Sequence, residues 1–172
     1  MPEKWWNKSG IAGLVCRFLF PQINRRFLWR LAVEALLLTL FLVLFRPCFI
    51  SGSSMEPNYH DRGFTLCFRW RYLFGAPERY DVVAVSYVGR RQLLKRVIAF
   101  PGETVEFKSG RILVDGEILD EPYVKLPGDW TLPAVTVRPG HCFVVGDNRS
   151  QSHLEHIFGE VDMKRITGGP LF

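Results

Sequence analysis

Two residues with the chemistry needed for acyl transfer occur in suitable local sequence, a serine in a turn and a lysine in an apolar run. Ser54 lies within residues 51–57, SGSSMEP, a stretch of small residues that would expose a hydroxyl and backbone N–H groups. On its own, such a stretch is more often a serine-rich linker. Lys95 lies within residues 92–100, QLLKRVIAF, whose composition predicts a β-strand.

The strand pattern predicts an unusual environment for Lys95. Alternation places its side chain on the same face as Leu93 and Val97, whereas Arg96 points to the other face. Apolar neighbours disfavour the ammonium form and would lower the lysine pKa by roughly two to three pKa units. A strand lysine is more often a surface residue that extends its amine into water. Beside Ser54, however, a neutral amine would act as the general base of Ser–Lys nucleophilic catalysis.

The histidines and cysteines do not suggest a competing catalytic or metal site. None of the four histidines stands in a triad order, and each is expected at the surface. The pair His153-x-x-His156 has metal-like spacing, but no cysteine or carboxylate set completes it. The four cysteines are scattered; a disulfide between Cys67 and Cys142 is possible, but two small buried thiols are favoured.

Basic residues concentrate near the N-terminus. Residues 1–50 hold seven Lys or Arg against two acids, whereas residues 51–172 hold fifteen of each. The larger part of the chain is therefore neutral, which argues against a basic nucleic-acid-binding domain.

An apolar segment follows the basic residues. Residues 31–45, LAVEALLLTLFLVLF, carry one charge, and a helix over 31–50 would be about 30 Å long, close to the thickness of a bilayer core. We expect 31–50 to be a single-pass transmembrane signal anchor, with the basic segment 1–30 in the cytoplasm. A cleaved signal peptide and a buried core helix are the alternatives. The first would need a small-residue cleavage site, and the second an apolar stripe along one face.

Residues 51–172 have the pattern of an all-β domain. Short runs of β-branched and aromatic residues alternate with turn residues, and no segment of ten or more shows a helical stripe. The runs expected as strands are 64–68, 81–87, 92–100, 104–107, 111–114, 135–137 and 142–145. Residues 68–74 alternate aromatics with arginines, which suits a half-buried strand or a patch on the bilayer surface better than a base-stacking platform.

Four motifs stand in order behind the predicted anchor: SGSSMEP at 51–57, RYDVV at 79–83, KRVIAFPGE at 95–103 and GDNRSQS at 146–152. From position 46 to the end, the sequence resembles the bacterial type I signal peptidases. The resemblance implies a membrane-bound serine endopeptidase that removes signal peptides on the outer side of the cytoplasmic membrane. It also implies a mainly β fold, in which an antiparallel catalytic domain with two β-sheet parts follows one N-terminal transmembrane helix.

The resemblance assigns roles to individual residues. Ser54 matches the nucleophile, Lys95 the general base, and Ser152 the serine that hydrogen-bonds and orients this lysine. The loop that packs beside the dyad matches Gly146, Asp147, Asn148 and Arg149. The family's oxyanion hole uses the N–H of the nucleophile and, in some members, a serine hydroxyl two residues earlier. That position is Gly52 here, so the second donor is expected to be a backbone N–H or Ser53, or to be absent.

Three positions depart from the family pattern. An Asp and an Arg usually follow the orienting serine by two and four residues, whereas Leu154 and His156 stand there in this sequence. Asn58 replaces a usual threonine. The supporting ion pair is therefore missing from the sequence.

The same resemblance guides our expectations about substrate and partners. An extended substrate would pair near residues 50–51 and with Leu93 and Leu94, its small side chains packing on apolar residues such as Met55. The expected partners are precursor proteins that carry signal peptides, the lipid bilayer and, transiently, the export machinery, with no nucleic acid, metal or organic cofactor. The expected location is the bacterial cytoplasmic membrane, with the N-terminus inside and the catalytic domain outside. Two alternatives stay open: a specialised maturation peptidase for one conjugation or pilus precursor, and a non-catalytic anchored domain that binds exported peptides.

Overall fold

The structure, a computed structural model, describes residues 24–50, 52–72, 75–87 and 92–171. Within these ranges the one α-helix is α2 (Arg25–Leu44). Asn24 caps its first turn, since the Asn24 Oδ1 accepts a hydrogen bond from the Phe27 N–H at 2.8 Å. No residue of α2 is buried, and its apolar side chains surround it. The helix therefore has the character expected of a membrane segment and not of a core helix.

The bounds of α2 differ from those expected from the sequence. The helix predicted over 31–50 ends at Leu44, and the following residues form strand β1 (Phe45–Phe49). Pro47 accounts for this end, because proline lacks an N–H and disfavours a helical conformation in the residue before it. At its start, α2 includes Arg25 and Arg26, which were expected in a separate basic segment. Residues 1–23 of that segment lie outside the described residues.

The remainder of the described chain is built from strands and two short 3-10 helices, η1 (His153–Glu155) and η2 (Met163–Arg165), so the all-β expectation is confirmed. The strands after β1 are β2 (Phe64–Phe68), β3 (Val82–Ser86), β4 (Gln92–Ala99), β5 (Thr104–Lys108), β6 (Arg111–Val114), β7 (Glu117–Ile118), β8 (Leu132–Thr136), β9 (His141–Val145), β10 (Gly159–Asp162) and β11 (Ile166–Pro170). All seven predicted runs are found as strands, within a few residues of their predicted bounds. The strands β1, β7, β10 and β11 were not predicted.

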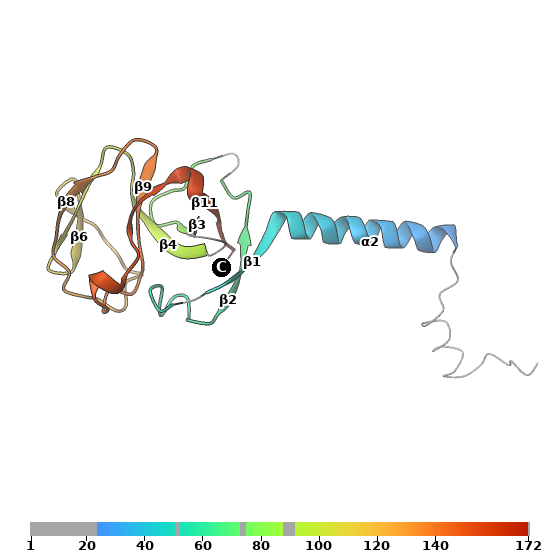
Figure 1. The fold of residues 1–172 in the computed structure, drawn as a ribbon, viewed down its shortest axis with the longest axis horizontal. Coiled ribbons are helices and arrows are strands. Elements are labelled where there is room, and N and C mark those ends of the chain that lie inside the picture. Colours follow the sequence, from blue (N-terminus) through green and yellow to red (C-terminus); the bar gives the residue numbers. More distant parts are fainter. Residues whose placement is uncertain (1–23, 51, 73–74, 88–91, 172) are drawn as a thin grey trace, which may run out of the picture. The chain divides into compact units, whose positions relative to one another are not determined.

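The strands form two antiparallel sheets (Figure 1). The larger has the order β1-β2-β11-β3-β4-β9-β10, and the smaller has the order β7-β6-β5-β8. The C-terminal strand β11 lies between β2 and β3 and pairs with both. This insertion explains how a strand with the sequence ITGGP forms despite two glycines and a proline: partners on both sides hold it.

Three apolar clusters fill the β unit. The largest contains residues of both sheets, among them Ile98 of β4, Phe107 of β5 and Phe143 of β9, together with Trp130. A second cluster surrounds Met55, and a third lies among β3, β4 and β9. Strand β4 contributes to all three, so its position is fixed by contacts on both of its faces.

Two smaller expectations are also tested. The described cysteines are free and buried, so Cys67 and Cys142 are the small buried side chains that we favoured, and they do not form a disulfide. Residues 69–72 form a turn and not a strand, because β2 ends at Phe68. In that turn Arg71 forms an ion pair with Asp81. Residues 73 and 74 lie outside the described part of the chain.

Candidate active site

The structure brings Ser54 and Lys95 into direct contact. Ser54 lies in the turn after β1, and Lys95 lies in the middle of β4, forty-one residues further along the chain. The Lys95 Nζ is 2.7 Å from the Ser54 Oγ. The neighbouring Met55 is 1% exposed and packs in an apolar cluster with Leu94, which fixes the serine turn on the same strand that carries the lysine. The pair thus has the geometry of a nucleophile and its base.

The amine of Lys95 is held in an environment that favours its neutral form. Only 3% of the residue is exposed, and this burial lowers its pKa to about 8. The negative charge of Asp147 acts in the opposite direction and raises the pKa, whereas the positive charge of Arg149 lowers it. Burial is the largest of the three effects, so the predicted direction of the pKa shift agrees with the structure.

A loop after β9 holds the backbone of the serine turn. The Asn148 N–H donates to the Ser54 carbonyl oxygen at 3.0 Å, and the Asn148 side-chain amide donates to the Ser53 carbonyl oxygen at 3.0 Å. Gly146 lies so close that a Cβ at this position would be 2.2 Å from the Ser54 carbonyl oxygen. Only glycine therefore allows this approach, which explains the first residue of the GDNR sequence.

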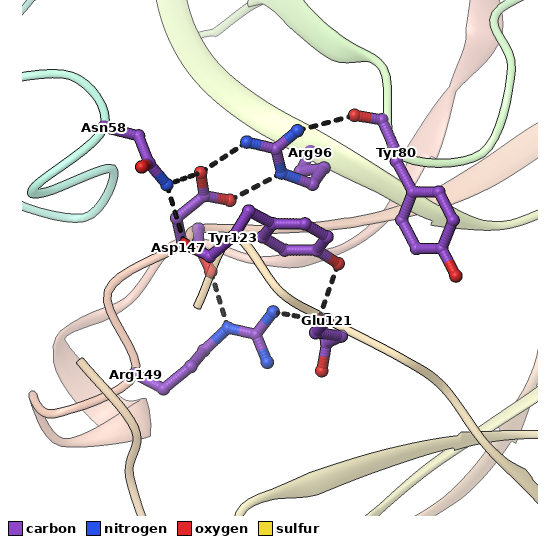
Figure 2. Close-up of polar contacts among 8 residues, drawn as sticks. Asn58, Tyr80, Arg96, Glu121, Tyr123, Asp147 and Arg149 are labelled. Carbon is purple, nitrogen blue, oxygen red and sulfur yellow. Dashed lines mark hydrogen bonds and ion pairs between the residues drawn. The ribbon is translucent and has the colours of Figure 1, made fainter. Parts of the chain in front are cut away.

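Asp147 is the centre of a buried polar network beside the dyad (Figure 2). Its carboxylate is fully buried and accepts two hydrogen bonds from the Arg96 guanidinium, at 2.8 and 2.5 Å. The Asn58 side-chain amide donates to the same carboxylate at 2.8 Å and to the Tyr123 carbonyl oxygen at 2.9 Å. The Arg96 guanidinium also lies over the Tyr123 ring, 4.0 Å from its centroid. Asn58 thus links the Asp147 carboxylate to the backbone at Tyr123.

Arg149 forms the second arm of this network. It is 2% exposed, its Nε donates to the Gly146 carbonyl oxygen at 2.6 Å, and its Nη2 is 2.7 Å from the Glu121 carboxylate. The Tyr123 hydroxyl donates a hydrogen bond to the same carboxylate at 2.7 Å (Figure 2). Arg149 therefore links the GDNR loop to the segment between β7 and β8. It acts on the dyad through its positive charge, which lowers the Lys95 pKa.

The candidate oxyanion donors are not equally available. The Gly52 N–H already donates to the Asp61 carboxylate at 2.7 Å, and Gly52 has a φ of +101°, which explains a glycine at this position. The Ser53 hydroxyl accepts a hydrogen bond from the Gln151 side-chain amide at 2.5 Å, and its own hydrogen stays available for donation. The Ser54 N–H has no acceptor among the described residues. The Ser54 N–H, unlike that of Gly52, is therefore a free backbone donor among the described residues of this turn.

A cleft of about 610 Å³ opens at Ser54. It is lined by residues of β1, the serine turn and the first half of β4, and includes Gly52, Met55, Leu93, Leu94 and, from the opposite loop, Ile157. β4 pairs with β3 over Gln92–Arg96, whereas its pairing with β9 begins only at Arg96. One edge of β4 from Gln92 to Lys95 thus has no strand partner in the described sheet, and this edge borders the cleft.

Ser152 and His156 lie where the sequence analysis did not expect them. Ser152 is exposed, its Oγ accepts a hydrogen bond from the Leu154 N–H at 3.3 Å, and it forms no hydrogen bond with Lys95 in the described residues. The physical reason is that Ser152 caps η1. His156, expected at the surface, is 8% exposed. Leu154, in the position of the usual aspartate, is 83% exposed.

Four members of the site escaped the sequence analysis: Arg96, Glu121, Tyr123 and Gln151. No acidic residue stands near Arg96 in the sequence at a spacing that would indicate an ion pair, and its partner Asp147 is fifty-one residues away. Such pairs arise from sheet topology, and a single sequence carries no local signal for them. No group of three or more His, Cys, Asp or Glu side chains within the described ranges could hold a metal ion.

Comparison with known proteins identifies the family of the chain. A family model described as "Signal peptidase, peptidase S26" matches residues 24–171. A probable signal peptidase I-1 of Synechocystis sp. is 35% identical over 153 residues, which cover 83% of this chain and 78% of that protein. Signal peptidase I of Bacillus caldolyticus is 33% identical over 159 residues, which cover 84% of this chain and 87% of that protein. A crystal structure of a signal peptidase I from Enterococcus faecalis covers 54% of this chain and 95% of its own, with 29% identity and a TM-score of 0.44.

The family match spans most of the chain, and both relatives exceed 30% identity over more than four fifths of it. The resemblance seen in the four motifs is thus confirmed over the whole β unit. The chain belongs to the signal peptidase family of serine peptidases, peptidase S26.

Proposed function

We propose that the chain is a membrane-anchored serine endopeptidase that cleaves signal peptides from exported precursor proteins, with Ser54 as nucleophile and Lys95 as general base. The observation that carries this proposal is the 2.7 Å contact between the Ser54 Oγ and an amine that is 3% exposed. A surface lysine would be protonated and could not accept the serine proton. A non-catalytic peptide-binding domain would have no use for a costly buried amine at this place.

The reaction follows from the geometry. Neutral Lys95 accepts the proton of the Ser54 hydroxyl as the oxygen attacks the scissile carbonyl carbon. The Ser54 N–H, and in our proposal the Ser53 hydroxyl, donate to the oxyanion that forms. The Lys95 ammonium then gives its proton to the leaving amine, and an ester with Ser54 remains. Lys95, neutral again, takes a proton from water, which attacks the ester carbon. The bond between this carbon and the Ser54 Oγ then breaks, the Lys95 ammonium returns the proton to the Ser54 oxygen, and the new C-terminus is released.

The unpaired edge of β4 is suited to hold the substrate. An extended peptide can form backbone hydrogen bonds with an exposed strand edge, and alternate side chains then point into pockets. The edge of β4 from Gln92 to Lys95 ends at the catalytic amine. Across the cleft lies β1, linked to β4 by a hydrogen bond from the Cys48 thiol to the Gln92 side chain at 3.1 Å. Small residues before the scissile bond would fit against Met55 and Leu94.

Helix α2 is proposed to anchor the enzyme. It is the described helix that is long and apolar enough to cross a membrane, with twenty residues and a mean hydropathy of 2.1. At 1.5 Å per residue its length is about 30 Å, which matches a bilayer core. The arginines at its start favour a cytoplasmic N-terminus and an outer β unit. Enzyme and precursor would then diffuse in one plane, which raises their encounter frequency, and transient contact with the export machinery is part of the proposal.

The function is tested with the full chain in detergent micelles and a fluorescently labelled precursor. We expect Ser54→Ala and Lys95→Ala to abolish cleavage, and the matched control Lys125→Ala, which alters an exposed lysine, to retain it. Substantial turnover by either dyad variant would reject the mechanism. A panel of unrelated precursors separates a general enzyme, which cleaves several, from a specialised maturation peptidase, which cleaves one.

A further inference from the structure

The connecting segment between β7 and β8, residues 119–131, contains no helix or strand. Segments of this length without secondary structure of their own are uncommon in a compact domain and are usually either functional or disordered. This segment is firmly attached to the core, because Trp130 near its end is 4% exposed and packs against Phe107 and Phe158. Its contacts with the rest of the site therefore indicate what it does.

The connecting segment lies along the GDNR loop. Four hydrogen bonds with described residues join it to that loop and to the turn that carries Ser54. These bonds run from the Arg149 Nη2 to the Glu121 carboxylate at 2.7 Å (Figure 2), from the Asn58 side-chain amide to the Tyr123 carbonyl oxygen at 2.9 Å, from the Arg149 N–H to the Leu126 carbonyl oxygen at 2.8 Å, and from the Trp130 indole N–H to the Gln151 carbonyl oxygen at 2.8 Å. The segment thus holds the catalytic side of the molecule over most of its length.

Gly128 is the point of closest approach between the connecting segment and the GDNR loop. A Cβ at this position would lie 1.9 Å from the Arg149 carbonyl oxygen and 2.8 Å from its carbonyl carbon. Cβ atoms in proteins essentially never lie within 3.0 Å of another heavy atom. Because the clashing atoms belong to the backbone, they cannot rotate away, and a side chain at position 128 would have to move the two segments apart.

The connecting segment has no free space on its other side. A Cβ at Gly110, in the turn between β5 and β6, would be 1.9 Å from the Gly128 carbonyl oxygen. In the same turn, the Gly110 N–H donates to the Trp130 carbonyl oxygen at 2.9 Å, and the Ser109 N–H donates to the Thr131 hydroxyl at 3.2 Å. The segment is therefore confined between this turn and the GDNR loop, so a displacement at Gly128 is transmitted to the loop.

Arg149 is joined to the backbone of the nucleophile through the residue before it. The Asn148 N–H and side-chain amide donate to the carbonyl oxygens of Ser54 and Ser53, both at 3.0 Å. Among the described residues, those that line the cleft at Ser54 include none from the connecting segment. The segment can therefore set the position of Ser54 without touching the substrate.

We propose that Gly128 is a positioning residue for the cleavage reaction: the close approach that it allows fixes Arg149 and Asn148, and Asn148 holds Ser54 within proton-transfer distance of Lys95. This inference rests on the proposed Ser54–Lys95 mechanism, in which the Ser54 Oγ must stay within reach of the Lys95 Nζ, 2.7 Å away. A misplacement of about 1 Å, caused by a change far from the reacting atoms, can lower a rate about a hundredfold.

The test measures cleavage of a labelled precursor by full-length variants in detergent, with the active fraction of each titrated to completion by a probe that acylates Ser54. Gly128→Ala adds one carbon at the close approach. Gly116→Ala is the matched control: it makes the same change at a φ of +85° with no atom within 4 Å, so it strains a turn without moving the loop. Lys125→Ala alters an exposed side chain of the connecting segment itself. Trp130→Phe keeps a ring in the core but removes the donor to the GDNR loop side.

We expect Gly128→Ala to lower kcat per titrated site about ten- to a hundredfold, because the nucleophile is misplaced. KM should stay within about threefold, because the residues that line the cleft are unchanged. Trp130→Phe removes one of the four hydrogen bonds and should lower kcat about threefold in the same way. Gly116→Ala and Lys125→Ala should match the wild type in both constants.

Three outcomes would overturn the inference. Wild-type kcat per titrated site in Gly128→Ala, with only stability lost, would mean that the contact supports the fold and not the reaction. An increase in KM alone would mean that the segment shapes the cleft. An equal loss of kcat in Gly116→Ala would mean that any strain in the fold slows cleavage.

Should Gly128→Ala not fold, Trp130→Phe decides, and wild-type kcat in that variant would overturn the inference. Failure of the proposed function has a different signature. Cleavage by Ser54→Ala, or a wild-type enzyme that the probe does not label at Ser54, would reject the Ser54–Lys95 mechanism itself.

Discussion

Replacement of Lys95 by methionine should stabilise the protein at neutral pH while it abolishes cleavage. The pKa of Lys95 is lowered from 10.5 to about 8 by burial, and at 1.36 kcal/mol per pKa unit this corresponds to about 3 kcal/mol of folding free energy lost below pH 8. The variant also loses the hydrogen bond to Ser54, which is worth about 1 kcal/mol. Methionine has a similar length and fills the site. The expected net gain is about 2 kcal/mol at pH 7.

The pH dependence of this gain follows from proton binding. Below pH 8 the lysine is protonated in both the folded and the unfolded state, so the full penalty applies to the wild type. Between about pH 8 and 10.5 the unfolded state binds more protons, and wild-type stability therefore rises with pH. The advantage of Lys95→Met should shrink over this range, vanish near about pH 9.5 and reverse above it, because the lost hydrogen bond to Ser54 still costs about 1 kcal/mol when the burial penalty is gone.

The assay is equilibrium unfolding of the full chain in detergent, followed by tryptophan fluorescence at several pH values. Lys125→Met, at an exposed lysine, is the control and should change stability little at any pH. A Lys95→Met protein that is less stable than the wild type by a constant amount from pH 7 to 10 would refute the reasoning. It would mean that burial of the Lys95 amine does not lower the free energy of unfolding.

Further predictions concern the charges and the backbone beside the dyad. Asp147→Asn removes the negative charge that raises the Lys95 pKa, so the acid limb of the kcat profile should move to lower pH; Arg96→Met leaves the Asp147 charge unpaired and should move it to higher pH. Both changes break a buried ion pair and should each cost about 3–5 kcal/mol of stability, measured by the same unfolding assay; shifts of equal sign would contradict this account. Gly146→Ala should reduce cleavage strongly, because its Cβ would lie 2.2 Å from the carbonyl oxygen of the nucleophilic serine. The control Gly75→Ala, which meets no atom within 4 Å, should cleave normally, and normal cleavage by Gly146→Ala would show that the loop need not approach so closely.

The parts of the site predicted from the sequence are those encoded by local pattern. Strand alternation put Lys95 among apolar side chains, and the structure buries it, because residues on both faces of β4 pack into clusters. The small-residue turn at Ser54 and the motif order indicated which segments meet. These signals depend on a few consecutive residues, so a single sequence carries them.

The parts that could not be predicted depend on distant pairing. β11 has a sequence poor in strand-forming residues and exists because β2 and β3 flank it. The partners Arg96 and Glu121 are set by the packing of segments that lie far apart in the chain. His156 was expected at the surface because a lone histidine usually is exposed, and the turn of η1 that carries it inward involves only three residues.

The network around Asp147 is best understood as a control on the charge of Lys95. A neutral lysine needs a site of low polarity, yet the GDNR loop places a fully buried carboxylate close enough to raise the lysine pKa. Arg96 neutralises that carboxylate through two hydrogen bonds, and Arg149 adds a positive charge that acts in the other direction. The Asp147 carboxylate forms hydrogen bonds with Arg96 and Asn58. It can therefore fix the loop against the serine turn while Lys95 stays neutral. A loop that used an unpaired aspartate for the same structural purpose would protonate the base on which the reaction depends.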